Sequence, residues 1–344
     1  MAKQNFTSLA NAILTNYGQL LVQAFTEAGQ DPMGIIAPNS AMGRIRDWGN
    51  IHIGNGEVQE DKAFDWGVDT AAQTAVSYGA NTTYSADTAE VFAAAALDWK
   101  RVGVPLSWDD LLATGSIPIR GGANALNYSF VKRLKALVTK IESMIFLDGT
   151  GNGSLDLTGL AASLSASNTY AGINQVGNTY WQAGVVVAGA ALAKSHLKSL
   201  IGDVWDKERM TPGSHEMWMP RGIWEQYVAL YIPKVSTTQA ESGGDMVAQI
   251  YMDGQVEVPI HVIPGMVSTE IWLLNKEQIH LNFKSQSASH SIPVDNVSEV
   301  IHQGIPIGMK EVPETTDTTS IWLRAWPQLA NFDPRTSAVV TTIT

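Results

Sequence analysis

Cysteine is absent from this chain of 344 residues. Its absence excludes disulfide cross-links, thiolate metal sites and cysteine nucleophiles. A chain without thiols also suits a reducing cytosol, so we expect the protein to be made in a cytoplasm.

Charge is also scarce. Charged residues make up 16% of the chain, and 33 acidic residues outnumber 22 basic ones, for a net charge of −11. The sequence contains no run of Lys and Arg. Because sequence-independent nucleic-acid binding needs clustered cations that displace counterions, the composition argues against direct DNA wrapping, although it leaves room for a local basic patch.

Long hydrophobic runs are missing as well. The longest, VVVAGAALA at Val185–Ala193, is shorter than the roughly 20 residues that cross a bilayer. The first ten residues, MAKQNFTSLA, lack the charged-then-apolar order of a signal peptide. We therefore expect neither a membrane partner nor a signal peptide.

Tryptophan, by contrast, is abundant, with 11 residues in a chain that is 45% hydrophobic. Large aromatic residues and few surface charges are typical of a surface that meets another protein, because interface cores favour Trp and Tyr and exclude Lys and Glu. A large core beneath a surface rich in Ser, Thr and Asn explains the same composition. The length allows two domains or one elaborate one.

An amphipathic helix predicted over Asn124–Leu147 is the strongest single element. Asn124 can cap its start, and Gly149 and Gly151 stop it. About 24 residues at 1.5 Å per residue give a rod of roughly 36 Å, which is long for a globular helix. Its apolar residues recur at three- and four-residue steps, as on one helical face: Leu126, Phe130, Leu134, Leu137, Ile141, Met144 and Ile145.

The region before this helix is less regular. The pattern predicts a helix over residues 5–29 and an extended arm over 30–60. The first part of residues 64–106 is predicted to be a strand. The Ala-rich segment Ala89–Leu97 has the residue propensities of a helix, but the alternation of its side chains is typical of a strand. Two strands around a polar tip would make a projecting hairpin. At Ser107, a cap residue followed by Asp109 and Asp110 predicts a helix start, which explains the paired carboxylates better than an acid–base dyad does.

The region after the long helix alternates between helix and strand. We predict a tight turn at Asp148–Ser154 and a mixed α+β domain at about 200–310. The closing segments are predicted to be two strands that return to the sheet beside the long helix. The remaining expected elements are a strand-like run over 155–165, helices over 190–209 and 222–232, and strands over 215–220, 256–264, 269–275 and 278–283.

The short motifs that carry chemistry are incomplete in this sequence. The glycine-rich turn starts like a calcium loop, but its twelfth position is Gly159 where Glu is required, and no Lys-Ser/Thr follows as in a phosphate loop. His215 and Glu216 do not continue into HExxH, and no GxSxG is present. His261 and His280 lie in strand-like runs and are expected to be packed or hydrogen-bonded. We therefore predict no catalytic, cofactor-binding or metal-ligating residues, no cofactor and no enzymatic activity.

The order of these motifs resembles the major capsid proteins of tailed bacteriophages, whose shell fold is the Hong Kong 97 type. The resemblance extends over about residues 1–344. It depends on the combination of the long helix, the Asp-Gly turn, Gly159-Leu160, Tyr170–Ile173 and Trp181. The matching stretches are VPLSWDDLL, IESMIFLDGTG, LDLTGLAA and NTYAGIN, then VPIHVIP, TEIWLLN and NFDPRTSAVVTTI.

The resemblance implies an α+β chain with a Hong Kong 97-like capsid fold, in which Ala89–Leu97 is a strand. The long helix would be the spine of a peripheral domain, with 148–190 and 312–344 supplying its sheet. The implied layout is an N-terminal arm at 1–60, an extended β-hairpin loop at 61–106 lying over the adjacent subunit, a peripheral domain with the spine helix at 107–190, an axial domain at 191–311, and return strands of the peripheral domain at 312–344.

The resemblance also implies a function. The chain would be a structural protein that self-assembles into pentamers and hexamers of an icosahedral phage head, which encloses double-stranded DNA without binding it specifically. Its partners would be other copies, a portal protein, and scaffolding or decoration proteins, with any scaffold separate because Met1 leads straight into the arm. The protein would be located in the virion after synthesis in the host bacterial cytoplasm. Removing Val68–Arg101 is expected to leave a folded subunit that cannot assemble.

Two alternatives remain open at this stage. An encapsulin-type shell shares the fold and holds enzymes where a phage head holds DNA. From a different class, a two-domain carbohydrate-binding hydrolase would use acidic residues in a cleft, with tryptophans stacking on sugars. Lys62 and Lys100 match no cross-linking motif, so no covalent cross-link is predicted.

Overall fold

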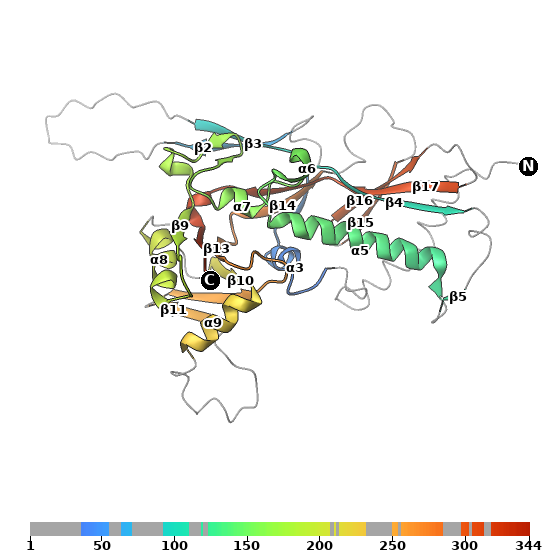
Figure 1. Cartoon of the computed structure of the whole chain (residues 1–344). Coiled ribbons are helices and arrows are strands. Elements are labelled where there is room, and N and C mark those ends of the chain that lie inside the picture. Colours follow the sequence, from blue (N-terminus) through green and yellow to red (C-terminus); the bar gives the residue numbers. More distant parts are fainter. Residues whose placement is uncertain are drawn as a thin grey trace, which may run out of the picture.

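A computed structural model gives the structure of the chain. In it the long helix lies at the centre, with sheets on either side and a hairpin at one edge (Figure 1). The residues that the structure describes are 36–54, 63–70, 92–109, 118–119, 123–206, 210, 213–231, 250–253, 256–284, 297–302, 305–312 and 318–344. The predicted helix over 5–29 and the tip of the predicted hairpin lie outside them.

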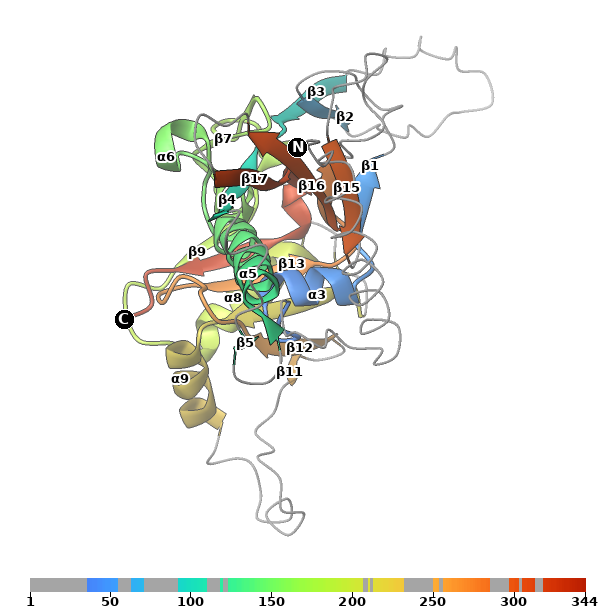
Figure 2. The same ribbon diagram turned by 90° about the vertical axis from the view of Figure 1, so that its right-hand side faces the viewer.

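Helix α5 (Ala125–Ile145) confirms the predicted rod. Its apolar stripe is buried from Leu134 to Ile145, while Lys132, Arg133 and Lys135 are exposed on the opposite side. Seen end-on in Figure 2, α5 runs between a four-stranded sheet and a six-stranded sheet. The main hydrophobic core contains residues of the helix and of both sheets, so the rod is the element on which the two sheets pack.

The four-stranded sheet is antiparallel throughout. Its order is β15 (Val297–His302), β16 (Ile305–Val312), β17 (Thr318–Ala325), β4 (Val102–Asp109). The predicted helix start at Ser107 is wrong, because Ser107 and Asp109 are strand residues opposite Ser320 and Thr318. Pairing with a strand more than 200 residues away satisfies their backbone groups and overrides the local capping signal.

The six-stranded sheet is mixed and covered on both faces. Helices α8 (Lys194–Trp205) and α9 (Arg221–Tyr231) contribute to the hydrophobic cluster on one face, and the core around α5 lies on the other. Burial on both faces explains why β10 and β13 are buried at every position, including the polar residues His215 and Glu216 of β10. The order is β11 (Ile250–Asp253), β12 (Val256–Val262), β10 (His215–Met219), β13 (Ile271–Asn275), β19 (Ala338–Thr341), β9 (Gly184–Val187).

The pairing differs from the predicted layout near three boundaries. β19, assigned through the resemblance to the return strands of the peripheral domain, pairs with β13 and β9 in the six-stranded sheet. β9 therefore joins that sheet too, although it was assigned with the spine helix. β15 and β16, assigned to the axial domain, belong instead to the four-stranded sheet with β17 and β4. The sequence shows strands but not their partners, so these assignments could not be made from it.

The segment 36–54 is not the extended arm that the sequence suggested. Helix α3 (Ala41–Asp47) is capped by Ser40, whose hydroxyl oxygen accepts from the Gly43 N–H, and its Met42 and Ile45 are buried in the main core. Strand β1 (Ile51–Gly54) then adds to a third sheet in the order β1, β14 (Ile279–Lys284), β18 (Pro327–Asn331). Scattered Gly and Pro hid this short helix because a seven-residue element shows little periodicity.

The predicted hairpin strands are paired. β2 (Ala63–Asp69) and β3 (Phe92–Asp98) are antiparallel, so the Ala-rich segment is a strand, as the resemblance implied. The run over 155–165 is not a strand: it holds the short helix α7 (Leu160–Ser163), preceded by the irregular turn α6 (Gly151–Ser154). The remaining small elements are β5 (Pro118–Ile119), β6 (Ala123–Asn124), β7 (Thr169–Tyr170), β8 (Ile173–Asn174), η2 (Thr179–Trp181) and η5 (Pro334–Thr336).

No helix in the described part of the chain combines the length and hydropathy that crossing a bilayer requires.

Candidate functional site

The base of the β2–β3 hairpin is anchored to the body. Val68, Ala95 and Leu97 are buried in a separate hydrophobic cluster with Tyr170 and Trp181. The indole N–H of Trp181 donates to the carbonyl oxygen of Tyr170 at 3.0 Å, and the two rings stack 5.8 Å apart. A two-stranded ribbon is marginal in water by itself. The tryptophan singled out in the sequence is therefore the support of this hairpin.

The outer face of the same hairpin is exposed and acidic. Strand alternation places Asp65, Gly67 and Asp69 on it, the first two opposite alanines of β3 and Asp69 opposite Phe92. Asp98 is exposed on the same face, diagonal to Asp65 across the two strands. The face carries carboxylates separated by glycine and alanine, so a partner can approach its backbone closely.

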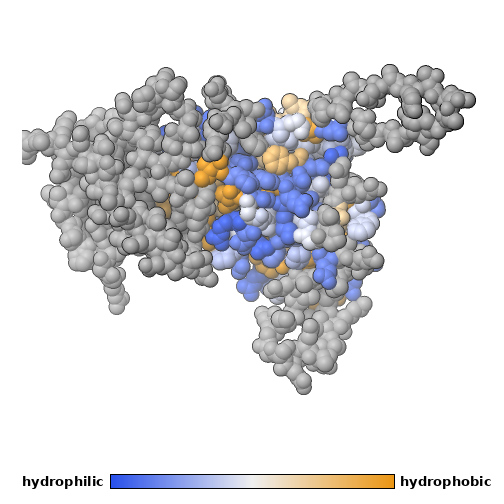
Figure 3. Space-filling view, turned by 180° about the vertical axis from the view of Figure 1, so that it is seen from behind, coloured by the Kyte–Doolittle hydropathy of each residue, from blue (hydrophilic) through white to orange (hydrophobic). Residues whose placement is uncertain are grey.

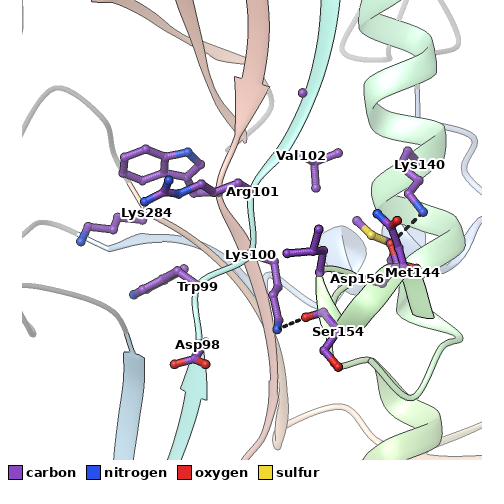
Figure 4. Close-up of a pocket in the computed structure, with 14 residues that line it drawn as sticks. Asp98, Trp99, Lys100, Arg101, Val102, Lys140, Met144, Ser154, Asp156 and Lys284 are labelled. Carbon is purple, nitrogen blue, oxygen red and sulfur yellow. Dashed lines mark hydrogen bonds and ion pairs between the residues drawn. The ribbon is translucent and has the colours of Figure 1, made fainter. Parts of the chain in front are cut away.

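A cleft of about 740 Å³ lies where β3 passes into β4, close to α5 (Figure 4). The Lys100 ammonium reaches across it and donates to the carbonyl oxygen of Ser154 at 2.8 Å. On the far wall, Lys140 of α5 forms an ion pair with Asp156 at 2.9 Å. The lining residues are Asp98, Trp99, Lys100, Arg101, Val102, Gly103, Lys140, Met144, Asn152, Ser154, Leu155, Asp156, Lys284 and Trp326.

Three cations surround one indole at this cleft. The guanidinium carbons of Arg101 and Arg324 lie 5.6 Å and 5.5 Å from the centre of the Trp326 ring, and the Lys284 ammonium lies 6.0 Å from it. Burial and the neighbouring charge of Arg101 lower the pKa of Arg324. We call Arg101, Lys284, Arg324 and Trp326 the Trp326 cluster. It gathers positive charge on a chain whose net charge is −11.

A second charged cluster holds α3 against the six-stranded sheet. The buried Glu216 carboxylate accepts from the Arg44 guanidinium at 2.7 Å, and the Nε2 atom of His261 lies 3.5 Å from it. The Lys276 ammonium is 4.0 Å away. Burial lowers the pKa of His261. The charge of Glu216 raises this pKa, and the charge of Arg44 lowers it further. The arrangement neutralises one buried carboxylate and links segments far apart in the sequence.

His215 is buried and hydrogen-bonded at both ring nitrogens. Its Nε2–H donates to the Thr336 carbonyl oxygen at 2.8 Å, so Nδ1 accepts from the Ser214 hydroxyl at 2.6 Å. Burial lowers the pKa of His215 to about 4. The imidazole is therefore neutral in the folded protein near pH 7.

Acidification is therefore expected to destabilise the subunit. The unfolded chain binds a proton at His215 near pH 6.5 and the folded chain only near pH 4, so stability falls as the pH drops between these values, by about 3 kcal/mol in all. Urea unfolding at pH 7 and pH 4.5 measures this loss. The His215→Gln variant should lose less stability on acidification than the wild type does. An equal loss in both proteins would contradict the role given to His215.

The histidine predictions are confirmed. His261 lies within hydrogen-bonding distance of Arg44, and His280 bonds the Glu277 carbonyl oxygen at 3.0 Å and stacks on His52. Among the described residues, no group of three or more His, Asp or Glu side chains is placed to hold a metal ion. The sequence did not reveal the Trp326 cluster, because its members come from three separate parts of the chain.

Proteins of known structure share this architecture. No family model and no curated protein matches the sequence. Among solved structures, a chain of the cyanophage A-1(L) capsid asymmetric unit aligns with a TM-score of 0.67 at 18% identity, covering 86% of this chain and 91% of that one. The capsid of an empty GTA particle aligns at 0.56 with 10% identity, covering 90% and 92%. The holo-SrpI encapsulin complex of Synechococcus elongatus PCC 7942 aligns at 0.52 with 10% identity, covering 85% of each chain.

The matched proteins form shells, and their shared architecture defines the class. This chain has the Hong Kong 97-type capsid fold, as the sequence resemblance implied. At these identities the likeness establishes the fold, and function is argued separately.

Proposed function

We propose that the chain is a major capsid protein that self-assembles into the pentamers and hexamers of an icosahedral phage head enclosing double-stranded DNA. The observation that carries this proposal is the alignment over most of both chains with a cyanophage capsid subunit. The role is structural, without enzymatic activity. The virion is the proposed location, after synthesis in the cytoplasm of a bacterial host.

The described surface fits a subunit that contacts several copies at once. The coloured part of the face in Figure 3 is largely hydrophilic, with small hydrophobic areas, so contacts between copies that use it would combine modest apolar and charged surfaces. A standard interface buries about 1,600 Å² and ranges widely in affinity. Several such contacts made by each subunit give a durable particle through multivalency. The negative net charge suits a wall that encloses DNA without gripping it.

The proposed layout keeps the predicted parts and revises their limits. The β2–β3 hairpin would be the extended loop. The four-stranded sheet with α5 would form the peripheral domain, and the six-stranded sheet with α8 and α9 the axial domain. A portal protein, and scaffolding or decoration proteins, would be further partners.

The encapsulin-type shell is the second candidate, because the SrpI complex shares the fold. Electron microscopy of the purified protein tests both, since each predicts closed particles. Particles that package double-stranded DNA when the phage packaging proteins are supplied would support the phage head, whereas particles that co-purify with an enzyme would support the encapsulin. A monodisperse monomer that binds a sugar would overturn both and favour the hydrolase.

Shortening the hairpin is expected to abolish assembly without unfolding the subunit. Removing all of Val68–Arg101, as the sequence suggested, would delete buried Ala95 and Leu97 and so damage the core. Replacing residues 70–91 with Asn-Gly retains the paired strands, because a two-residue turn can join Asp69 to its partner Phe92. We expect wild-type circular dichroism and no particles by light scattering. Normal particles would show that the extended loop is dispensable.

A further inference from the structure

Two histidines stack on the polar face of the three-stranded sheet. Strand register places His52 of β1, His280 and Asn282 of β14 and Gln328 of β18 on this face, whereas Leu281 lies on the opposite face, in the main core. The ring centres of His52 and His280 are 4.9 Å apart, and the ring planes differ by 23°. His52 is exposed and His280 is half-buried. Two titratable rings are therefore held in contact where protons from solvent can reach them.

Ring contacts continue from this stack to the base of the hairpin. The ring centres of His280 and Phe332 are 5.0 Å apart, and Phe332 meets Trp66 of β2 edge to face at 5.3 Å. Trp66 in turn lies 6.2 Å from Trp181, which belongs to the cluster that anchors the hairpin. Aromatic contacts thus join β1 to the hairpin that follows it in the chain.

Strand β1 is held weakly. It has four residues, lies at the edge of its sheet and, within the described part of the chain, pairs with β14 alone (Figure 2). Its side chains Ile51 and Ile53 are only half-buried. Short elements with little buried apolar surface open locally at a low free energy. A modest repulsion is therefore enough to change how often β1 is paired.

We infer that the His52–His280 stack is an acid-sensitive contact, which keeps β1 on β14 near neutral pH and releases β1 when both rings are protonated. Two imidazolium charges at this separation repel each other, whereas neutral rings do not. Release of β1 removes one support from Phe332 and Trp66, and so loosens the start of the hairpin. This device belongs to the single subunit and goes beyond the proposed shell function.

The surroundings of His280 favour its neutral form. Burial lowers the pKa of His280, the charge of His52 lowers it further, and the hydrogen bond to the Glu277 carbonyl oxygen opposes both. The Glu277 side chain is exposed, and the β18 residues on the same face, Gln328 and Ala330, are neutral. Because the pKa of His280 is lower in the paired arrangement than in a released chain, falling pH favours release.

The other charged groups on the neighbouring elements do not compensate the stack. Lys284 lies further along β14, with its ammonium over a tryptophan ring. Asp333, which follows Phe332, forms an ion pair with Arg335 at 2.8 Å. Strand alternation places Asp65 and Asp69 of β2 on the outer face of the hairpin. The neighbouring charge that shifts the pKa of His280 is therefore that of its stacking partner.

Hydrogen–deuterium exchange of the purified full-length chain tests this inference, with labelling times corrected for the intrinsic effect of pH. Exchange of residues 50–54 should rise by about threefold or more between pH 7.5 and pH 5.5. In His52→Phe/His280→Phe the two rings still stack but carry no charge, so this rise should disappear. The control His196→Phe removes a histidine of α8 and should retain the rise.

His215 titrates in all of these proteins, so its effect on global stability is common to them. An equal rise in the wild type and the double variant would overturn the inference. So would a rise that is the same in β1 and in β13, because it would indicate global unfolding, and so would unprotected β1 amides at both pH values. If the double variant does not fold, His52→Phe alone changes an exposed side chain and removes one charge, so it should reduce the rise. An unchanged rise in that variant also overturns the inference.

Discussion

Gly159→Ala is expected to be among the most damaging single-methyl changes in the described part of the protein. The chain crosses the end of α5 here, so close that a Cβ atom would lie 2.5 Å from the Met144 carbonyl oxygen and 2.6 Å from that of Leu147, and would also meet that of Ile145. All three obstacles are backbone atoms at the end of a buried helix, so none can rotate away. We expect a loss of about 3 kcal/mol or more of stability and little soluble protein.

Thermal melting of the purified subunit measures this loss, and Gly202→Ala is the matched control. Gly202 lies within α8, and no atom comes within 4 Å of a Cβ added there. Alanine should stabilise that helix by up to about 1 kcal/mol. Equal melting temperatures for the two alanine variants would show that the crossing at Gly159 can relax.

Arg44→Met is the second change with a large expected effect. It leaves the buried Glu216 carboxylate without its 2.7 Å partner, while Lys276 at 4.0 Å and the half-buried His261 give only partial compensation. We expect a loss of about 2–3 kcal/mol, because an unpaired buried charge is costly. Urea unfolding of the unassembled subunit gives the value.

A double variant separates the ion pair from simple packing. In Arg44→Met/Glu216→Gln no charge is left unpaired at that position, so most of the lost stability should return. Arg221→Met is the control, because the partner Glu225 is exposed and such pairs contribute little. A cost for Arg44→Met no larger than that for Arg221→Met would show that the cluster is not what holds α3 in place.

Local patterns in the sequence predicted the elements well where one face or the whole segment is buried. The stripe from Leu134 to Ile145 predicted α5, and the segment His215–Met219, predicted as a buried strand, is a strand buried at every position. The predictions failed where distant partners decide the conformation. Ser107 has a helix-start signal and lies in a strand because β17 pairs with it, and α3 is too short to show a period.

The side-chain clusters of the candidate site were harder to predict from the sequence. Trp181 was singled out only through the family resemblance, and the structure places it buried beneath the hairpin. Nothing in the local sequence relates Arg101 to Lys284 or Trp326, because only the folded chain brings them together. The sequence around Glu216 likewise does not indicate that it pairs with Arg44, which lies 172 residues earlier.

The pairing of the chain's early and late strands determines when folding can finish. β1 pairs with β14 and β4 with β17, so early segments wait for partners that are made about 200 residues later. At roughly 5–20 residues per second, a ribosome takes on the order of 10–40 s to supply them. A prematurely terminated polypeptide would lack β17 and leave one side of α5 uncovered. Such fragments would expose apolar surface of the helix and be open to proteolysis and aggregation.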